Sequence, residues 1–452
     1  MSELLGQLNF KKILFRGENI DQPTLEEAIN HLANYLEKRI YSQSPFILLM
    51  AHTHIKTVAA YYAILKIGKI AVIVDPNSLE IELNETILDV DPCAIISLNT
   101  KNIKFDYDQE IIFRPLNKEF VVHSNLKDVC TLAYTNAEDG YSKGAMLTEK
   151  NLMSEIQAIK TTNRLNDNSV ICALLPFSHL YGFVHGVLVI TQAGGSGLII
   201  ELNLLQINNL ISEIIQVNVS HLHTVPSVYY MLSKVPGIEN MVKDIKELYS
   251  GGIQLSSFIF ESFYNKTKRK IREGYGLTEC SPAIAGNFQE DDPVLGSFGK
   301  PFPGCEIKIL DEFGNERKAE QIGEICVKGD MVFRGYFNHE NTTKIVLKDD
   351  WFYTGDLGKK DKNGYLYFCG LKKEMINTSG NKIYPKKLER LLKMHQNVLL
   401  ANVFKEVSPL QGHVVGVHIK LHKTSINSQH DVKDWCYKNI NNNLLPKTWH
   451  FE

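Results

Sequence analysis

The 452-residue sequence has eight cysteines but no CxxC pair. Scattered single cysteines indicate buried thiols in a reducing compartment, and they argue against a disulfide framework or a zinc site. The sequence also lacks an excess of either charge, because 49 Lys+Arg against 51 Asp+Glu give a formal net charge of -2. This balance argues against a protein that binds nucleic acid or anionic membranes through bulk charge.

Long hydrophobic runs and targeting signals are missing as well. The most apolar tract, residues 183–200, is interrupted by His185, Thr191, Gln192 and a Gly-Gly-Ser-Gly cluster, whereas a membrane span needs about twenty apolar residues. The N-terminal stretch lacks the basic and then apolar pattern of a signal peptide. We therefore expect a cytoplasmic protein with no membrane span and no nucleic-acid partner.

The sequence does contain alternating helical and strand patterns. Residues 24–41 place apolar residues at helical spacing behind Thr24, which is the expected N-cap. Short apolar runs such as 45–52 and 69–76 are typical of buried parallel strands. The alternation predicts an α/β fold with a mostly parallel sheet, and the closely spaced strands after about residue 290 predict a smaller β-rich part.

Polar loops follow the predicted strands. Because the carboxyl ends of parallel strands share one edge of a sheet, we expect these loops to converge on one cleft. The loops are residues 135–144, 176–182, 224–227, 250–252 and 274–279.

The last of these loops reads Gly-Tyr-Gly-Leu-Thr-Glu. Its glycines allow a backbone to approach a ligand closely. Tyr275 offers a flat face for stacking, Thr278 a hydroxyl for an anion, and Glu279 a hard oxygen ligand for Mg²⁺. An ordinary surface turn is an equally good interpretation of so short a motif.

A second candidate is Lys143 beside Gly144, in a strand-to-helix loop that precedes an expected N-cap at Thr148. Such a loop suits either phosphate binding or a plain turn, and the Walker pattern GxxxxGK[ST] is absent. His179, which follows Pro176, is open to a structural or a functional interpretation.

Together the motifs resemble the adenylate-forming superfamily, in family order and over nearly the whole chain. This superfamily includes acyl-CoA synthetases, aryl-CoA ligases, firefly luciferase and the adenylation domains of nonribosomal peptide synthetases, and the motif style is most similar to acyl-CoA ligases. The segments that carry the resemblance are YTNAEDGYSKGAMLTEKNL, LPFSHLYG, YSGGIQL, GYGLTE, GKPFPG, GEICVKGDMVFRGYFN, YTGDL and GLKKEMINTSGNKIYPKKLE.

The resemblance implies a domain plan and a reaction. A large N-terminal domain of mixed, mostly parallel sheets would span residues 1–370, with its β-rich subdomain at about 290–370. A hinge at 371–373 would lead to a small mobile α+β domain at 374–452. The implied reaction joins a carboxylic acid and MgATP into an acyl-AMP, whose acyl group then passes to a thiol of CoA or phosphopantetheine.

The resemblance also implies substrates and partners. Amino-acid-activating members carry an Asp in the motif at 176–182, which this sequence lacks. A fatty or aromatic acid is therefore favoured over an amino acid. The expected partner is a small carboxylic acid or acyl adenylate, and an acyl carrier protein is a further candidate.

Residue roles carry over by motif. Glu279 would bind Mg²⁺, and Thr278 and Lys143 would contact the phosphates, which makes these three the catalytic candidates. Tyr275 would stack on adenine and Asp356 would hold the ribose hydroxyls. The other candidates are Thr135, Gly140, Gly144, Gly252, Gly274, Gly276 and Lys373 for the nucleotide, His179, Tyr181, Gly251, Gly252 and Gly274 for the substrate, and Gly380 for passage of the pantetheine arm.

Three departures from the family pattern stand against full activity. Asn136-Ala137-Glu138-Asp139 replaces Ser-Gly-Thr-Thr, Ser142 replaces Pro, and Leu371 replaces an Arg that contacts the ribose. Two unit charges about 4 Å apart interact by about 4 kcal/mol at an effective dielectric constant of about 20, so two carboxylates facing a triphosphate would weaken ATP binding. The printed sequence ends LLPKTWHFE, so we expect a C-terminal domain shortened relative to the family, without the Thr-Gly-Lys loop, to which Lys447 does not correspond.

Three interpretations stay open. The protein is an acid-thiol ligase with weakened adenylation, or an adenylation-deficient member that transfers a pre-activated acyl group. In the third interpretation it is a non-catalytic relative that binds a ligand or a protein partner.

Overall fold

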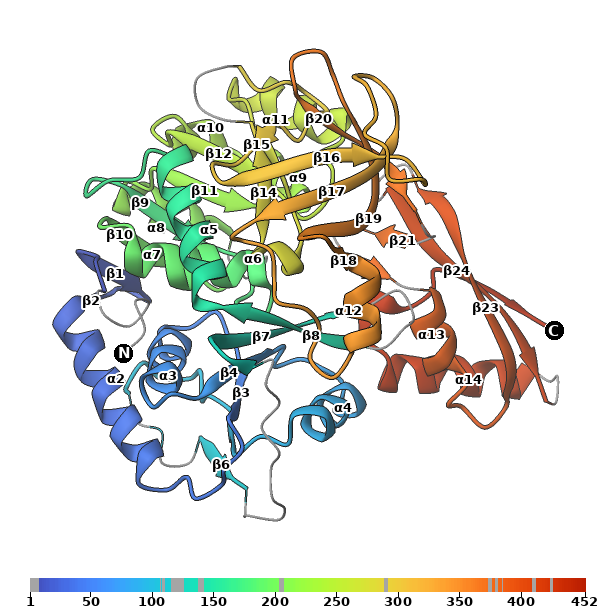
Figure 1. Ribbon diagram of the computed structural model, residues 1–452, viewed down its shortest axis with the longest axis horizontal. Helices are drawn as coiled ribbons and strands as arrows, with labels where there is room; N and C mark the ends of the chain where they lie inside the picture. Colours follow the sequence, from blue (N-terminus) through green and yellow to red (C-terminus); the bar gives the residue numbers. More distant parts are fainter. Residues whose placement is uncertain are drawn as a thin grey trace. The chain divides into compact units, whose positions relative to one another are not determined.

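The computed structural model describes residues 8–105, 107, 110–114, 126–136, 142–202, 207–287, 292–372, 376–378, 381–383, 385–408, 412–422 and 426–452 (Figure 1). The chain divides into two compact units. The first comprises Met1–Pro76, Ile87–Tyr134 and Gly144–Cys369, and the second Asn77–Thr86, Thr135–Lys143 and Gly370–Glu452. The predicted α/β class is confirmed.

A nine-stranded sheet dominates the first unit, in the order β15-β14-β13-β12-β11-β9-β10-β1-β2. Its strands are β1 (Lys12–Phe15), β2 (Glu18–Asp21), β9 (Val170–Ala173), β10 (Ser196–Ile199), β11 (His221–Thr224), β12 (Glu247–Ser250), β13 (Arg272–Gly276), β14 (Ala283–Gly286) and β15 (Lys300–Pro301). The run from β1 to β13 is parallel, whereas β2, β14 and β15 are antiparallel. The carboxyl ends of β9, β11, β12 and β13 therefore share one edge, as the sequence predicted for their loops.

A six-stranded sheet has the order β6-β5-β3-β4-β7-β8. It consists of β3 (Phe46–Met50), β4 (Ile70–Val74), β5 (Ala94–Ile96), β6 (Ile111–Phe113), β7 (Val129–Asn136) and β8 (Ser142–Thr148). The apolar runs predicted as parallel strands form β3 and β4, which pair in parallel and are almost entirely buried.

Two predicted helix caps had different outcomes. Thr148 caps α5 (Glu149–Thr162) and forms a capping box with Asn151, which confirms the prediction. Thr24 does not cap α2 (Gln22–Glu37), because Asp21 does so and accepts a hydrogen bond from the Thr24 backbone N–H at 3.0 Å. The prediction of Thr24 was wrong, since proline is tolerated in the first turn and the helix begins before it.

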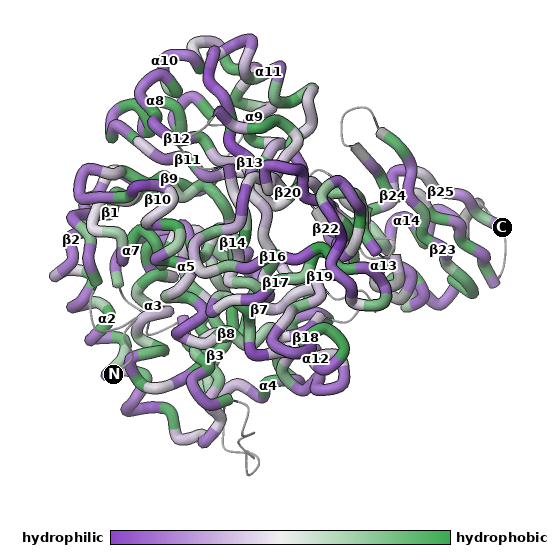
Figure 2. The backbone as a smooth tube through the Cα atoms, turned by 45° about the horizontal axis from the view of Figure 1, so that its top comes forward, coloured by the Kyte–Doolittle hydropathy of each residue, from purple (hydrophilic) through white to green (hydrophobic). Residues whose placement is uncertain are grey.

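The remaining helices of the N-terminal part are α3 (Ile55–Lys66), α4 (Glu80–Val90), α8 (Ile207–Val217), α9 (Pro226–Ser233), α10 (Ile238–Val242), α11 (Ser257–Thr267) and α12 (Glu340–Val346). Side chains of α8, α9, α10 and α11 share one hydrophobic core with β11 and β12. These helices are coloured in both purple and green in Figure 2, which fits helices with one buried face.

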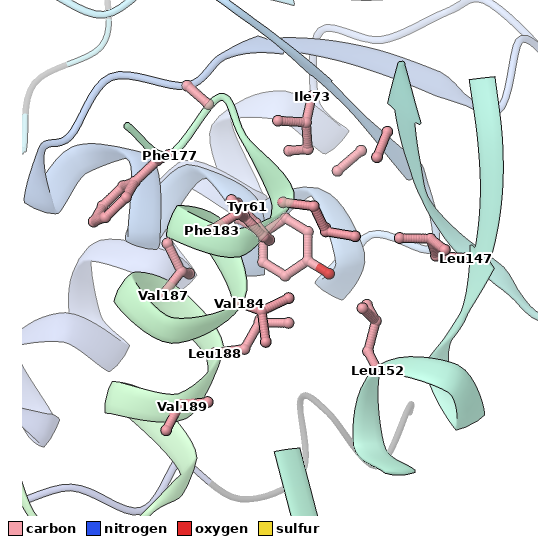
Figure 3. Close-up of a cluster of buried hydrophobic side chains, with 14 of the residues drawn as sticks. Tyr61, Ile73, Leu147, Leu152, Phe177, Phe183, Val184, Val187, Leu188 and Val189 are labelled. Carbon is pink, nitrogen blue, oxygen red and sulfur yellow. The ribbon is translucent and has the colours of Figure 1, made fainter. Parts of the chain in front are cut away.

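The most apolar tract begins in a buried helix. This helix runs through α6 (Leu180–Phe183), the π-helical turn η2 (Val184–Val189) and α7 (Ile190–Gln192), and the tract continues into β10. Figure 3 shows Phe183, Val184, Val187 and Leu188 projecting from it, with Tyr61 nearby. The ring centroids of Tyr61 and Phe183 are 4.8 Å apart. Among the described residues, no helix is both long and apolar enough to cross a membrane.

A β-rich part completes the first unit, with the strand order β16-β17-β19-β18 and β20 paired to β19. Its strands are β16 (Cys305–Leu310), β17 (Gly323–Gly329), β18 (Leu347–Lys348), β19 (Trp351–Lys360) and β20 (Leu366–Leu371).

The second unit has a five-stranded sheet in the order β22-β21-β24-β23, with β25 paired to β24. Its elements are β21 (Ile376–Thr378), β22 (Asn381–Ile383), α13 (Pro385–Leu392), β23 (Val398–Ser408), β24 (Gly412–Leu421), α14 (Ile426–Asn439), the 3-10 turn η5 (Asn442–Leu444) and β25 (Thr448–Phe451). Lys447 directly precedes β25, and its backbone N–H donates to the carbonyl of Val415 at 2.7 Å. It therefore lies at the start of a sheet strand.

Candidate functional site

The turn Gly274–Cys280 joins the end of β13 to the 3-10 turn η4 (Thr278–Cys280). The backbone N–H of Leu277 donates to the carbonyl of Pro282 at 2.7 Å, and that of Phe333 donates to the carbonyl of Glu279 at 2.8 Å. A Cβ atom at Gly276 would lie 2.2 Å from the Pro282 carbonyl oxygen. The chain's own packing thus requires glycine at this position.

Tyr275 and Asp356 meet in this site. The hydroxyl of Tyr275 donates to Oδ2 of Asp356 at 2.5 Å, and both residues are buried. Burial, and then the negative charge of Asp356, raises the pKa of Tyr275 well above its ordinary value. The structure thereby brings the predicted adenine-stacking and ribose-binding residues together, although 81 positions separate them.

Phe298 covers one face of the Tyr275 ring. The two centroids are 5.0 Å apart and the planes differ by 7°, which is a stacked arrangement. A planar base that stacks on Tyr275 would therefore use the opposite face. Phe298 was not predicted as a site residue. Its only indication in the sequence is its position directly before the GKPFPG motif.

Glu279 is buried, and its Oε1 accepts a hydrogen bond from the Tyr336 hydroxyl at 2.8 Å. Thr278, one residue earlier, is partly exposed. Tyr336 also went unrecognised as a site residue, although it lies in the GEICVKGDMVFRGYFN segment. Its hydroxyl fixes the carboxylate that the sequence predicts to be the Mg²⁺ ligand.

Two further carboxyl groups support the turn. Oε1 of Glu273 accepts from the Leu255 N–H at 2.6 Å, and Oε1 of Glu155 accepts from the Ala283 N–H at 3.0 Å. Oε2 of each has no hydrogen-bond partner within the described part of the chain. Burial raises the pKa of Glu273 to about 8 and that of Glu155 well above its ordinary value. Both groups therefore favour the protonated form at neutral pH.

The predicted substrate residues fall into two groups. Tyr181 packs on Gly251, where an added Cβ would lie 3.2 Å from the tyrosine ring. Within the described chain, a Cβ at Gly252 would meet Val225 at 3.6 Å, an ordinary contact, so space remains beside this glycine. A Cβ at Gly274 would lie 3.3 Å from the Ala285 carbonyl oxygen, which is a tight approach. His179 precedes α6 with an exposed side chain.

The remaining candidates are distributed differently. Thr135 and Lys143 belong to the second unit, and Lys143 is buried. Gly144 belongs to the first unit, where an added Cβ would lie 3.3 Å from the Tyr134 ring. Leu371 ends β20. The predictions for Ala137, Glu138, Asp139, Gly140, Lys373 and Gly380 fall outside the described residues.

A family model described as AMP-binding enzyme matches residues 12–337. The chain belongs to this family. The chain is 31% identical over 278 residues to a long-chain-fatty-acid–CoA ligase of Salmonella typhimurium, covering 60% of this chain and 49% of that protein. It thus spans about half the length of this relative.

Two other relatives match over more of the chain. A long-chain-fatty-acid–CoA ligase of Bacillus subtilis is 26% identical over 477 residues, covering 93% of this chain and 84% of that protein. The amide bond synthetase McbA of Marinactinospora thermotolerans superposes with a TM-score of 0.86 at 18% identity, over 100% of this chain and 96% of that one. The structural likeness shows that the two proteins share one fold.

The donor set of the AMP-binding enzyme fits a magnesium nucleotide. Glu279 supplies a carboxylate, which is a hard oxygen ligand suited to Mg²⁺. Asp356 supplies a carboxylate acceptor for hydroxyl groups, and Tyr275 an aromatic face. The space beside Gly252 is what a ligand lying close to the backbone needs.

Proposed function

We propose that this AMP-binding enzyme is an acid-thiol ligase. A carboxylic acid, fatty or aromatic rather than an amino acid, attacks the α-phosphate of MgATP to give an acyl-AMP and pyrophosphate. The thiol of CoA or of a carrier protein then takes the acyl group, and AMP leaves. The similarity to two long-chain-fatty-acid–CoA ligases supports a CoA thioester as the product.

The observation that carries the proposal is the contact between Tyr275 and Asp356 beside the carboxylate of Glu279. One hydroxyl-to-carboxylate hydrogen bond of 2.5 Å fixes the aromatic ring and the acid relative to each other. A second of 2.8 Å, from Tyr336, fixes Glu279 four residues after Tyr275. An aromatic ring and two carboxylates are thus held on one turn and its neighbours, which supports the proposed roles in binding a base, a ribose and a metal ion.

In this mechanism Tyr275 orients the base and Asp356 accepts hydrogen bonds from the ribose. Glu279 holds Mg²⁺, which when bound neutralises charge on the phosphate groups. Thr278 donates its hydroxyl to a phosphate oxygen, and Lys143 adds a positive charge to the phosphates as the acid attacks. Gly252 leaves space for the acyl group, and Gly274 lines the same pocket.

A specific observation favours a second candidate, acyl transfer without adenylation. Leu371 occupies the position where the resemblance implies an arginine, and it ends β20 with an apolar side chain. The resemblance implies that this arginine contacts the ribose, so its absence weakens the binding of ATP. Transfer from a supplied acyl thioester does not require ATP to bind.

Two assays separate the candidates. The ligase predicts ATP–pyrophosphate exchange that depends on a carboxylic acid, and thioester formation when CoA is added. Exchange with no acid of a panel of fatty and aromatic acids, from well-folded protein, would contradict it. Thioester formation from supplied acyl-AMP in the absence of exchange would establish the second candidate.

A further inference from the structure

A column of four rings lies inside the first unit, beginning at the predicted substrate residue Tyr181. The centroids of Tyr181 and His185 are 4.9 Å apart, and those of His185 and His223 are 4.3 Å apart. His223 then stacks on Tyr249 at 4.8 Å with 15° between the planes. We call these four residues the polar ring column.

The column contains hydrogen-bonding atoms that lack partners. Nδ1 of His185 and the hydroxyl of Tyr249 have no partner in the described parts of the chain. Only 6% of His185 and 7% of Tyr249 is exposed. Buried polar atoms are nearly always paired, and one without a partner costs about 1–3 kcal/mol.

Several polar groups beside the column have partners, whereas the hydroxyls of Thr224 and Ser250, at the ends of β11 and β12, also lack them within the described residues. Nδ2 of Asn163 donates to Nε2 of His223 at 3.2 Å. Nε2 of His221 donates to the Asn163 carbonyl at 3.1 Å, and the Ser220 hydroxyl donates to Nδ1 of His221 at 2.7 Å. Each of these histidine nitrogens has its own protein partner.

The column also interrupts an apolar helix. His185 lies in the π-helical turn η2, whose five other residues are glycine and aliphatic residues. The residues labelled on this helix in Figure 3 are all apolar. A π-helical turn within an α-helix frequently marks a functional site, and here it carries the one histidine of the helix Leu180–Gln192.

The column begins at the edge of the sheet where the proposed site lies. Tyr181 is partly exposed, and its ring packs on Gly251, directly after the carboxyl end of β12. Tyr249 belongs to β12 and His223 to the neighbouring β11, with which it is in register. The four rings therefore lead from the proposed substrate residues into the core.

We propose that the polar ring column is the end wall of the acyl pocket and selects an aromatic acid whose tail carries a neutral hydrogen-bonding group, such as a phenolic hydroxyl. This rests on the proposed acid-thiol ligase function. An unbranched alkyl tail leaves Nδ1 of His185 and the Tyr249 hydroxyl without partners. A ring that bears a hydroxyl packs on the column and offers these atoms a group that can donate or accept a hydrogen bond.

The charge of the column restricts the tail further. Burial lowers the pKa of His185 to about 3 and that of His223 well below its ordinary value, so both are neutral at pH 7. None of the four rings therefore carries a positive charge that could pair with a second carboxylate on the tail. A hydroxyl is therefore accepted more readily than an acidic group.

The test compares three acids of similar length: 3-(4-hydroxyphenyl)propanoate, 3-phenylpropanoate and octanoate. We expect kcat/KM for the hydroxylated acid to exceed that for each of the others about tenfold or more, the ratio that one buried hydrogen bond supplies. Equal or higher values for octanoate would overturn the proposal. Binding without ATP, measured by thermal shift, gives a second readout that does not depend on turnover.

Ring-preserving variants locate the effect. Tyr249→Phe removes only the hydroxyl, and His185→Phe removes only the nitrogens, and each should reduce the preference for the hydroxylated acid to about threefold or less. Tyr61→Phe is the matched control, because Tyr61 is also buried but its hydroxyl bonds to Thr131 at 2.8 Å, outside the column. An unchanged preference in both column variants would contradict the proposal.

The two proposals fail in different ways. The thermal shifts could follow the predicted order of the three acids while neither thioester formation nor exchange is detected. That result would contradict the ligase proposal and leave the column as a selective binding site. Turnover with a different order of acids would keep the ligase and remove the role of the column. Absence of both binding and turnover for the hydroxylated acid would overturn the proposal about the column.

Discussion

Two pairs of buried carboxyl groups surround the turn Gly274–Cys280, and they differ in their partners. Glu279 and Asp356, the site pair, accept hydrogen bonds from the hydroxyls of Tyr336 and Tyr275. Glu155 and Glu273, the supporting pair, accept from backbone N–H groups of Ala283 and Leu255. The site pair is thus held by side chains, whereas the supporting pair holds the backbone.

The difference indicates which acids act through charge. Each member of the supporting pair has one oxygen without a partner in the described chain, and burial raises the pKa of both. A carboxyl group that keeps its proton contributes shape and one acceptor, which an amide also supplies. The proposed roles of the site pair, metal binding and ribose binding, depend on a carboxylate. Amide substitutions should therefore separate the pairs.

The largest effect is expected for Glu279→Gln. An amide keeps the size and an acceptor for the Tyr336 hydroxyl but removes the negative charge that the proposed Mg²⁺ site requires. We expect ATP–pyrophosphate exchange to fall a hundredfold or more, which is the usual cost of losing a catalytic electrostatic contact.

The control for this variant is Glu273→Gln, a supporting-pair substitution six residues earlier. It should leave exchange within about threefold of the original rate. Equal losses in the two variants would mean that the two pairs do not differ in function, and thermal unfolding of both proteins would identify a loss of fold as the cause.

An intermediate effect, on stability and not on rate, is expected for Glu273→Gln. The native pKa of about 8 lies above the ordinary value of 4.5, so the unfolded chain releases this proton first as the pH rises. The original protein therefore loses stability between pH 4.5 and 8 by up to about 1.4 kcal/mol per pH unit from this group. The glutamine variant lacks this loss.

Unfolding by denaturant at several pH values measures this difference. The stability of Glu273→Gln relative to the original should rise with pH across the window from 4.5 to 8, by an amount on the order of a few kcal/mol. Glu27→Gln, a substitution at an exposed position of α2, should show no such trend. A difference that stays constant with pH would show that Glu273 is ionised in the native protein.

The sequence predicted the parts of the fold that depend on local patterns. The apolar run at β3, the Thr148 cap and the polar loops after β9, β11, β12 and β13 all follow from short stretches of chain. The cap at Thr24 was wrong because a competing cap, Asp21, stood three residues earlier. A local pattern cannot decide between Asp21 and Thr24, since both residue types are good N-caps.

The site could be predicted only in part. Residue types in GYGLTE, and the family resemblance of YTGDL, indicated a nucleotide site, but not that Tyr275 donates to Asp356 or that Phe298 covers its ring. The contact between Glu155 and Ala283 spans 128 positions, and no periodicity of the sequence encodes it. Such pairs depend on how α5 and β14 pack, which is settled by the tertiary structure.

The smallest effect is expected for Glu155→Gln, the other supporting substitution. Glu155 is 0% exposed, and its role in the structure is to accept the Ala283 N–H next to the turn. Glutamine can supply the same acceptor, so exchange should stay within about twofold. Glu155→Leu removes it and should lower the free energy of unfolding by about 1–3 kcal/mol, the cost of a buried N–H without a partner.

The two Glu155 variants sharpen the comparison because only glutamine keeps the hydrogen-bond acceptor, whereas both variants lack an ionisable carboxyl group. If Glu155 acts only by holding the backbone, the leucine variant should show a raised KM for ATP that the glutamine variant does not. An equal fall of exchange in both variants would instead show that its negative charge matters, and Glu155 would then belong with Glu279 and Asp356.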